Sequence, residues 1–138
     1  MTDVAYIALG SNVGNRDLAL ARARAAIAAI RDTRLIAATE VEETDPIGPI
    51  PQGKYLNQMV AVSTTLPPRT LLAALHRIER AAGRVRASRW GPRTLDLDIV
   101  MIEGKEYSDD ALVIPHPELP HRDFWQRELA ELRGVTDG

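Results

Sequence analysis

The stretch Arg89 to Ile99 reads R-W-G-P-R-T-L-D-L-D-I, and its second half predicts a strand in which apolar residues alternate with two aspartates. Successive side chains of a strand point to opposite faces, so Leu95 and Leu97 enter a core while Asp96 and Asp98 share the other face. Two carboxylates this close repel each other unless a cation lies between them and the group that they face. The stretch therefore predicts a strand with an acidic site on one side.

Arginines precede the two aspartates without any acidic residue among them. They are Arg84, Arg86, Arg89 and Arg93. Magnesium is usually held by one or two carboxylates together with phosphate oxygens, and guanidinium groups bind phosphates in pairs of hydrogen bonds. The combination predicts a site for magnesium and a polyphosphate. The alternative is a solvent-facing strand beside arginines that form surface salt bridges.

Length and composition limit the class of protein. The chain has 138 residues, no cysteine and a formal net charge of −2. We expect one domain over residues 1–133, with residues 134–138 as a disordered tail. Disulfides and thiolate metal sites are excluded. The N-terminal residues lack the pattern of a signal peptide, no apolar run approaches the roughly 18 residues of a membrane span, and the acidic balance disfavours nucleic acid. We expect a cytoplasmic protein without membrane or nucleic-acid partners.

Periodicity of the apolar residues predicts the order β-α-β-β-α-β, followed by a late strand and a closing helix. The predicted strands are 4–9, 35–43, 56–65, the aspartate strand and 112–114; the predicted helices begin near 16 and at 68, with the last over 124–133. Gly83 is expected to end the second helix as a C-cap. The order is typical of a ferredoxin-like α+β domain, an antiparallel sheet with helices packed on one face, here extended by a C-terminal strand and short helix.

Two glycine-containing loops are candidates for ligand binding. Residues 10–16, G-S-N-V-G-N-R, lack both the G-K-[ST] of a nucleotide P-loop and the spacing of a dinucleotide fingerprint, so we interpret them as structural. Residues 44–54 form an unusually long connection between two predicted strands, and they are rich in proline and glycine. A connection of this length and composition is more typical of a binding loop than of a hairpin turn.

Further segments surround these features in a fixed order. They are A-L-G-S-N at 8–12, T-D-P-I-G at 44–48, Y-L-N at 55–57, G-R-V-R at 83–86, the stretch at 89–99, and P-H-P with R-D-F between 115 and 124. Together they resemble the 6-hydroxymethyl-7,8-dihydropterin pyrophosphokinase family. The resemblance implies an ATP-dependent enzyme of folate biosynthesis that moves a pyrophosphoryl group from ATP to a pterin alcohol and releases AMP. It implies the same ferredoxin-like fold, and we expect a monomer.

The resemblance also implies which residues contact ATP. It implies two Mg²⁺ ions between the phosphates and the carboxylates of Asp96 and Asp98. With these two, Arg84 and Arg93 are the expected catalytic residues, because a guanidinium keeps its charge and meets two phosphate oxygens at once. The implied ATP contacts are Glu79, Arg84, Arg86, Trp90, Arg93, Ile99, His116 and Arg122. The alternatives are surface ion pairing for Arg86 and Arg122 and a structural role for His116.

A flat pterin requires aromatic faces and hydrogen-bonding groups at its edge. The implied pterin contacts are Thr44, Ile47, Tyr55, Asn57, Trp90, Asp96 and Phe124. After Phe124, the residues Trp125, Leu129 and Leu132 recur at helical spacing. We therefore expect a short amphipathic helix that docks on the sheet and supports the Phe124 ring from behind.

Two other interpretations remain open at this stage. One is a catalytically inactive relative that still binds nucleotide. The other is a ferredoxin-like module that binds RNA through its arginines, although the acidic composition and the lack of surface aromatic residues on the predicted strands weigh against it.

Overall fold

The middle of the molecule is formed by β1 (Asp3–Ser11) and β4 (Tyr55–Thr64), whose side chains are buried on both faces of the sheet. The structure is a computed structural model, and it describes residues 2–46, 48–83 and 94–136. The other strands are β2 (Thr33–Ala38), β3 (Glu42–Thr44), β5 (Asp96–Ile102), β6 (Tyr107–Ser108) and β7 (Val113–Ile114), and the helices are α1 (Arg16–Ala28), α2 (Pro68–Ala81) and α3 (Asp123–Thr136). An α+β chain with an antiparallel sheet is confirmed.

The main sheet has the order β2-β4-β1-β5, and each of these strands is antiparallel to its neighbours. β3 also pairs with β4, while β6 and β7 form a separate two-stranded sheet. Among the described residues β5 pairs only with β1 in the main sheet, so it is an edge strand there. This position leaves one side of the strand that carries Asp96 and Asp98 open to other contacts.

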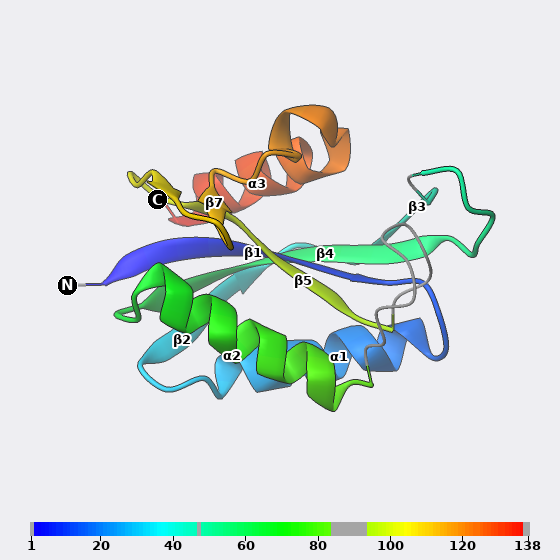
Figure 1. Ribbon diagram of the computed structural model, residues 1–138, viewed down its shortest axis with the longest axis horizontal. Helices are drawn as coiled ribbons and strands as arrows, with labels where there is room; N and C mark the ends of the chain where they lie inside the picture. Colours follow the sequence, from blue (N-terminus) through cyan, green and yellow to red (C-terminus); the bar gives the residue numbers. More distant parts are fainter. Residues whose placement is uncertain (1, 47, 84–93, 137–138) are drawn as a thin grey trace.

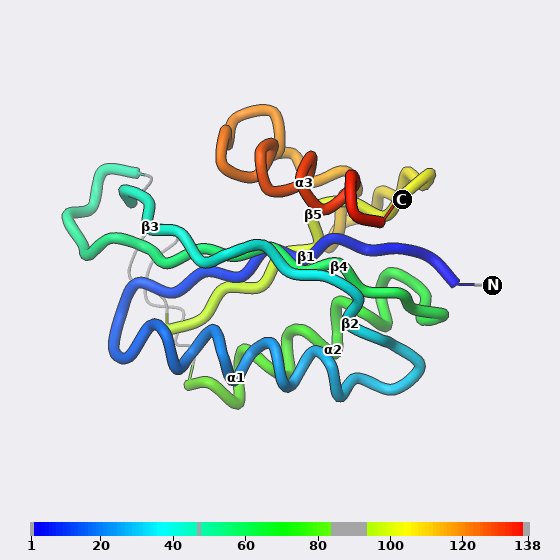
Figure 2. The backbone as a smooth tube through the Cα atoms, turned by 180° about the vertical axis from the view of Figure 1, so that it is seen from behind, coloured from blue at the N-terminus to red at the C-terminus, as the bar shows by residue number. Residues whose placement is uncertain are grey.

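Helices cover both faces of the sheet (Figures 1 and 2). α1 and α2 lie on one face, over a core that contains Ile7 and Leu9. α3 lies on the opposite face, over Tyr6 and Ala8. α1 and α2 pack on one face as expected, and the added C-terminal helix α3, for which the sequence predicted no particular face, covers the other. The physical reason is that both alternating sets of β1 side chains are apolar, so both faces of the sheet must be covered.

Some element boundaries differ from those predicted. The predicted strand 35–43 is interrupted between β2 and β3, where Thr39 accepts a hydrogen bond from the Met59 N–H through Oγ1 and donates its own N–H to the Met59 carbonyl. α3 continues to Thr136, so three residues expected in the tail are helical. Gly83 follows α2 with φ of 81°, which confirms the predicted C-cap glycine. Within the described residues, no helix is long and apolar enough to cross a membrane.

Candidate functional site

The two aspartates begin β5 and lie half-buried, while Leu95, Leu97 and Ile99 are almost completely buried. The predicted alternation of this strand is confirmed. Asp98 pairs across the sheet with Ala8, whose side chain belongs to the core beneath α3. Side chains of paired residues point to the same face, so both carboxylates lie on the α3 side of the sheet.

A glycine separates the first aspartate from two predicted pterin contacts. Gly10 pairs with Asn57 of β4 on one side and with Asp96 of β5 on the other. A Cβ atom at Gly10 would lie 3.4 Å from both Asn57 Oδ1 and Tyr55 Cδ1. Asn57 Nδ2 donates to Thr44 Oγ1, which joins the end of β3 to the same place. The structure thus brings Thr44, Tyr55, Asn57 and Asp96 together around a position that has no side chain.

His116 approaches the second aspartate from the segment that follows β7. Its Nε2 lies 3.6 Å from Asp98 Oδ1, a distance too long for a hydrogen bond but short enough for an electrostatic contact. The backbone N–H of Glu118 donates to His116 Nδ1, and the His116 N–H donates to the Val100 carbonyl. Since Nδ1 accepts a hydrogen bond, the neutral imidazole carries its proton on Nε2. His116 is therefore held with an N–H donor directed toward Asp98.

Trp125 connects three of the predicted site residues. It is 2% exposed, and its ring packs edge-on against His116 with a centroid distance of 5.0 Å. The guanidinium of Arg122 lies 4.3 Å from the centre of the Trp125 ring, and Phe124 packs against the same ring at 6.3 Å. Sequence reasoning predicted the support of Phe124 but missed the contacts with His116 and Arg122. Helical spacing could not reveal them, because they arise where the segment before α3 folds back onto it.

Glu79 joins α2 to the edge strand. Its side chain is 5% exposed, and Oε2 accepts a 2.8 Å hydrogen bond from the backbone N–H of Leu97, which stands between the two aspartates. An edge strand has backbone N–H groups that no neighbouring strand satisfies, and a buried one needs a partner. Glu79 was predicted as an ATP contact; the structure places its carboxylate on the backbone that carries Asp96 and Asp98.

A cavity of about 340 Å³ lies against the edge of β5, between α2 and the β6–β7 segment. It brings the predicted ATP contacts Glu79, Ile99 and His116 together with the predicted magnesium ligands, Asp96 and Asp98. The described lining also includes Asp109 and Asp110, and it contains no lysine or arginine. A nucleoside triphosphate could enter such an acidic cavity only together with cations that offset the repulsion between its phosphates and the carboxylates. The predicted magnesium and arginines would meet this need.

One wall of this cavity is fixed by a cluster that sequence reasoning also missed. Asp109 Oδ2 accepts hydrogen bonds from the Tyr107 hydroxyl and from Arg69 at the start of α2, and Oδ1 accepts the backbone N–H groups of Ala111 and Leu112. These bonds, the one from Tyr107 first, hold the pKa of the Asp109 carboxyl well below its usual range. The cluster ties the β6–β7 segment to α2.

In the ranges that the structure covers, no three His, Cys, Asp or Glu side chains converge as a metal cluster. Two half-buried carboxylates on one strand still fit magnesium, which commonly completes its coordination with water and phosphate oxygens. The predicted residues that lie outside the described ranges are Ile47, Arg84, Arg86, Arg89, Trp90 and Arg93.

Comparison with known proteins gives the family. A model of the 7,8-dihydro-6-hydroxymethylpterin-pyrophosphokinase (HPPK) family matches residues 6–134. The chain belongs to this family. The resemblance that the sequence motifs indicated is confirmed, and the HPPK match spans every residue of the candidate site.

Relatives of this HPPK chain carry the name 2-amino-4-hydroxy-6-hydroxymethyldihydropteridine pyrophosphokinase. One from Bacillus subtilis is 41% identical over 135 residues, which cover 96% of this chain and 79% of the relative. One from Methylorubrum extorquens is 42% identical over 128 residues, 93% of this chain and 81% of the relative. One from Haemophilus influenzae is 41% identical over 120 residues, 87% of this chain and 75% of the relative.

Proposed function

We propose that this chain transfers the pyrophosphoryl group of ATP to 6-hydroxymethyl-7,8-dihydropterin, giving AMP and the pterin diphosphate in folate biosynthesis. The observation that carries the proposal is the HPPK family match over residues 6–134, together with relatives about 41% identical that are named for this activity. The match does not favour the RNA-binding alternative.

ATP is proposed to occupy the cavity at the edge of β5. Support comes from its lining, which includes three predicted ATP contacts, Glu79, Ile99 and His116. The two predicted magnesium ligands, Asp96 and Asp98, also line it. Asp96 and Asp98 would hold Mg²⁺, two ions by resemblance to the family. When bound, magnesium would neutralise phosphate charge and align the phosphates for in-line attack. Glu79 fixes the backbone between the two aspartates, and the Nε2–H of His116 would donate to a phosphate oxygen.

The pterin is proposed to lie over Gly10. Tyr55 and Asn57 border this position on one side and Asp96 on the other, and glycine keeps the strand surface between them free of a side chain. Phe124, supported by Trp125, would supply a further aromatic face. Asp96 therefore borders both the pterin position and the ATP cavity. A pterin hydroxymethyl group here would lie close to the phosphates, which is the positioning that phosphoryl-type transfer requires.

The remaining roles rest on sequence. Arg84 and Arg93 are proposed to stabilise the charge of the transferred group, Arg86 and Arg122 to contact ATP, and Trp90 and Ile47 to enclose the substrates. Such roles suit the acidic cavity, which needs cations to hold a triphosphate.

We also propose a ferredoxin-like fold, supported by the element order β1-α1-β2-β4-α2-β5 and by the sheet order β2-β4-β1-β5. A monomer in the cytoplasm is proposed from the sequence alone.

The test is AMP release from ATP, measured with a coupled assay in the presence and absence of the dihydropterin. We expect AMP to appear only when ATP, Mg²⁺ and pterin are all present. If the chain binds ATP by calorimetry but releases no AMP with the pterin, the inactive-relative alternative is correct and the proposal fails.

A further inference from the structure

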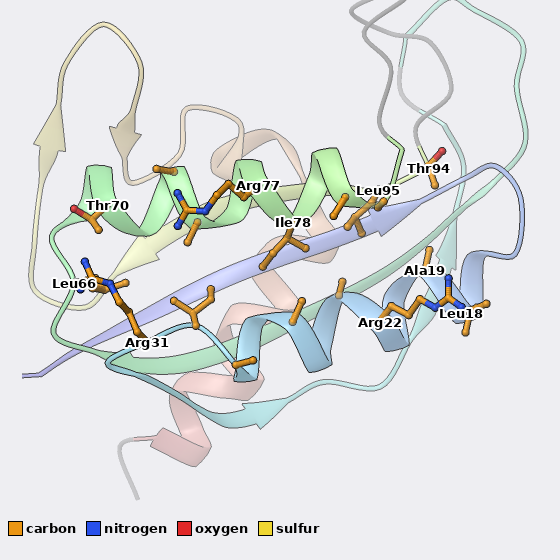
Figure 3. Close-up of a pocket in the computed structure, with 18 of the residues that line it drawn as sticks. Leu18, Ala19, Arg22, Arg31, Leu66, Thr70, Arg77, Ile78, Thr94 and Leu95 are labelled. Carbon is orange, nitrogen blue, oxygen red and sulfur yellow. The ribbon is translucent and has the colours of Figure 1, made fainter.

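Outside the candidate site, a groove of about 880 Å³ lies between α1 and α2 (Figure 3). It lies on the face of the sheet opposite α3, whereas Asp96 and Asp98 point toward the α3 side. Leu95 contributes to its lining at one end, directly before the aspartate strand. The groove is thus separate from the site proposed for pyrophosphoryl transfer.

Alanines explain why the space between these helices is open. The lining alanines are Ala19, Ala23, Ala26 and Ala29 from α1 and its C-cap, and Ala73, Ala74, Ala81 and Ala82 from α2 and its C-cap. A side chain that ends at Cβ cannot span the gap between two helices, so the larger residues beneath stay accessible. Ile30 and Ile78 are only partly buried there, although both pack against the core. Small residues also allow another helix to approach closely.

Arginines give the groove its charge. Arg22, Arg31 and Arg77 line it, and Figure 3 shows Arg22 beside Leu18, Arg77 on α2 and Arg31 toward the Leu66 end. No described residue forms an ion pair with any of them, and the described lining contains no Asp or Glu. The chain as a whole is acidic, with a formal net charge of −2. The groove is therefore a local positive surface around an apolar floor.

Four other described arginines form ion pairs with carboxylates. Arg16 bonds to Glu43, Arg69 to Asp109, Arg127 to Glu42 and Arg133 to Glu103. The groove arginines have neither such an ion pair within the described residues nor a carboxylate beside them in the lining, so they are available to an outside anion. A second copy of the chain cannot supply this anion through its own groove, because the arginines of the two copies would then face each other.

We propose that the groove between α1 and α2 docks an amphipathic helix of a partner protein, one with an apolar ridge flanked by Asp and Glu. The ridge would fill the space that the alanines leave and contact Ile30 and Ile78, and the flanking carboxylates would pair with the three arginines. Nucleic acid fits less well, because an apolar floor offers nothing to a phosphate backbone.

The probe is a synthetic helical peptide of about 18 residues, roughly five turns, with leucines along one face and glutamates on both flanks. A control peptide carries lysines in place of the glutamates. Binding to the whole chain is followed by fluorescence anisotropy and mapped by backbone amide chemical shifts. We expect the acidic peptide to bind with shifts confined to the groove, and the lysine peptide not to bind.

Variants of the chain locate the contact. Arg77→Glu should weaken acidic-peptide binding by about tenfold or more. The matched control is Arg80→Glu, an exposed arginine of the same helix that does not line the groove, and it should leave binding unchanged. Ala81→Trp should fill the groove and block the peptide. Pyrophosphokinase activity should be the same in all three variants, so this inference and the proposed function can fail separately.

The proposal is overturned if the acidic peptide does not bind, or if its shifts fall outside the groove. Equal weakening by Arg77→Glu and Arg80→Glu would also overturn it. A different outcome would assign the groove to another partner. In that outcome the peptide fails to bind, the chain binds poly-uridine RNA or associates with itself, and Arg77→Glu abolishes this binding.

Discussion

Two carboxylates of one strand carry the largest share of the proposed chemistry. Replacing Asp96 or Asp98 with alanine should reduce turnover by about a thousandfold, roughly 4 kcal/mol, because each change removes a proposed magnesium ligand. Folding should survive, since both side chains are half-buried and lie near other carboxylates that repel them. Circular dichroism and steady-state kinetics measure the two effects. A folded variant with activity near that of the parent would contradict the metal assignment.

Gly10 allows a separate test of the pterin position. In Gly10→Ala the new Cβ would lie 3.4 Å from Asn57 and Tyr55, a van der Waals contact that the fold can accommodate. The methyl group would occupy the floor proposed for the ring. We expect pterin affinity to fall by about tenfold while ATP affinity stays the same. Calorimetric titration of each ligand measures this; equal weakening of both would indicate a general distortion of the strand.

Sequence alone predicted the residues with a local pattern. The alternation around Asp96 follows from strand geometry and needs no knowledge of the neighbouring strands. The role of Gly10 depends on β1 pairing with both β4 and β5 in a particular register. The contact between Glu79 and Leu97 likewise depends on how α2 packs against the sheet edge. Neither register nor packing is encoded in a short motif.

At the scale of elements, α3 supports one wall of the site through Trp125. Trp125→Ala should destabilise the chain by roughly 3–5 kcal/mol, as truncation of a buried aromatic usually does. The ring contacts both Phe124 and His116, so we expect weaker binding of pterin and of ATP. Trp125→Phe is the control that keeps most of the packing. Thermal melts and calorimetry measure the effects, and unaltered affinities in a destabilised variant would show that α3 does not position the site.

The same helix contains a buried acid. Glu128 is 5% exposed, and its carboxylate oxygens have no hydrogen-bond partner among the described residues. Burial, and then the nearby Glu42, raise the pKa of Glu128 to about 8 from 4.5. The folded state therefore binds this proton more tightly than the unfolded state. Its stabilising effect is complete below the unfolded pKa of 4.5 and is lost as the pH rises through about 8.

The melting temperature of the parent should therefore fall between pH 5 and pH 9. The free energy of unfolding decreases over this range because it spans most of the interval between the unfolded and folded pKa values of Glu128. Glu128→Gln should remove most of this dependence, because the amide does not ionise. Glu131→Gln, an exposed change on the same helix, should leave it almost unaltered. Parallel pH dependence in Glu128→Gln and the parent would show that another group is responsible.

Elements with strong periodicity were predictable, and their contacts were not. The pattern of apolar residues predicted β1, α1, β4, α2 and β5, because each buries a regular stripe or face. The interruption at Thr39 was not predictable, since it depends on a side-chain bond to a residue twenty positions away. The sheet face covered by α3 is set by tertiary packing.

In the whole molecule, the main sheet separates two surfaces with different proposed roles. The candidate site lies on the α3 side and at the edge of β5, and the groove proposed for a partner lies between α1 and α2 on the other side (Figures 1 and 3). The HPPK family and the coarse fold were recognisable from the sequence because the motifs extend over most of the chain. Assignments to Ile47 and to residues 84–93 remain predictions from sequence, since they lie outside the described ranges.

The central claim is that a pyrophosphoryl group, not a single phosphoryl group, moves to the pterin. The most direct measurement follows ATP labelled at its β-phosphorus, incubated with Mg²⁺, the dihydropterin and the purified chain. We predict that the label appears in the pterin product while unlabelled AMP is released in equal amount, and that Asp96→Ala yields neither. Release of labelled ADP, or AMP formation that does not require the pterin, would contradict the account.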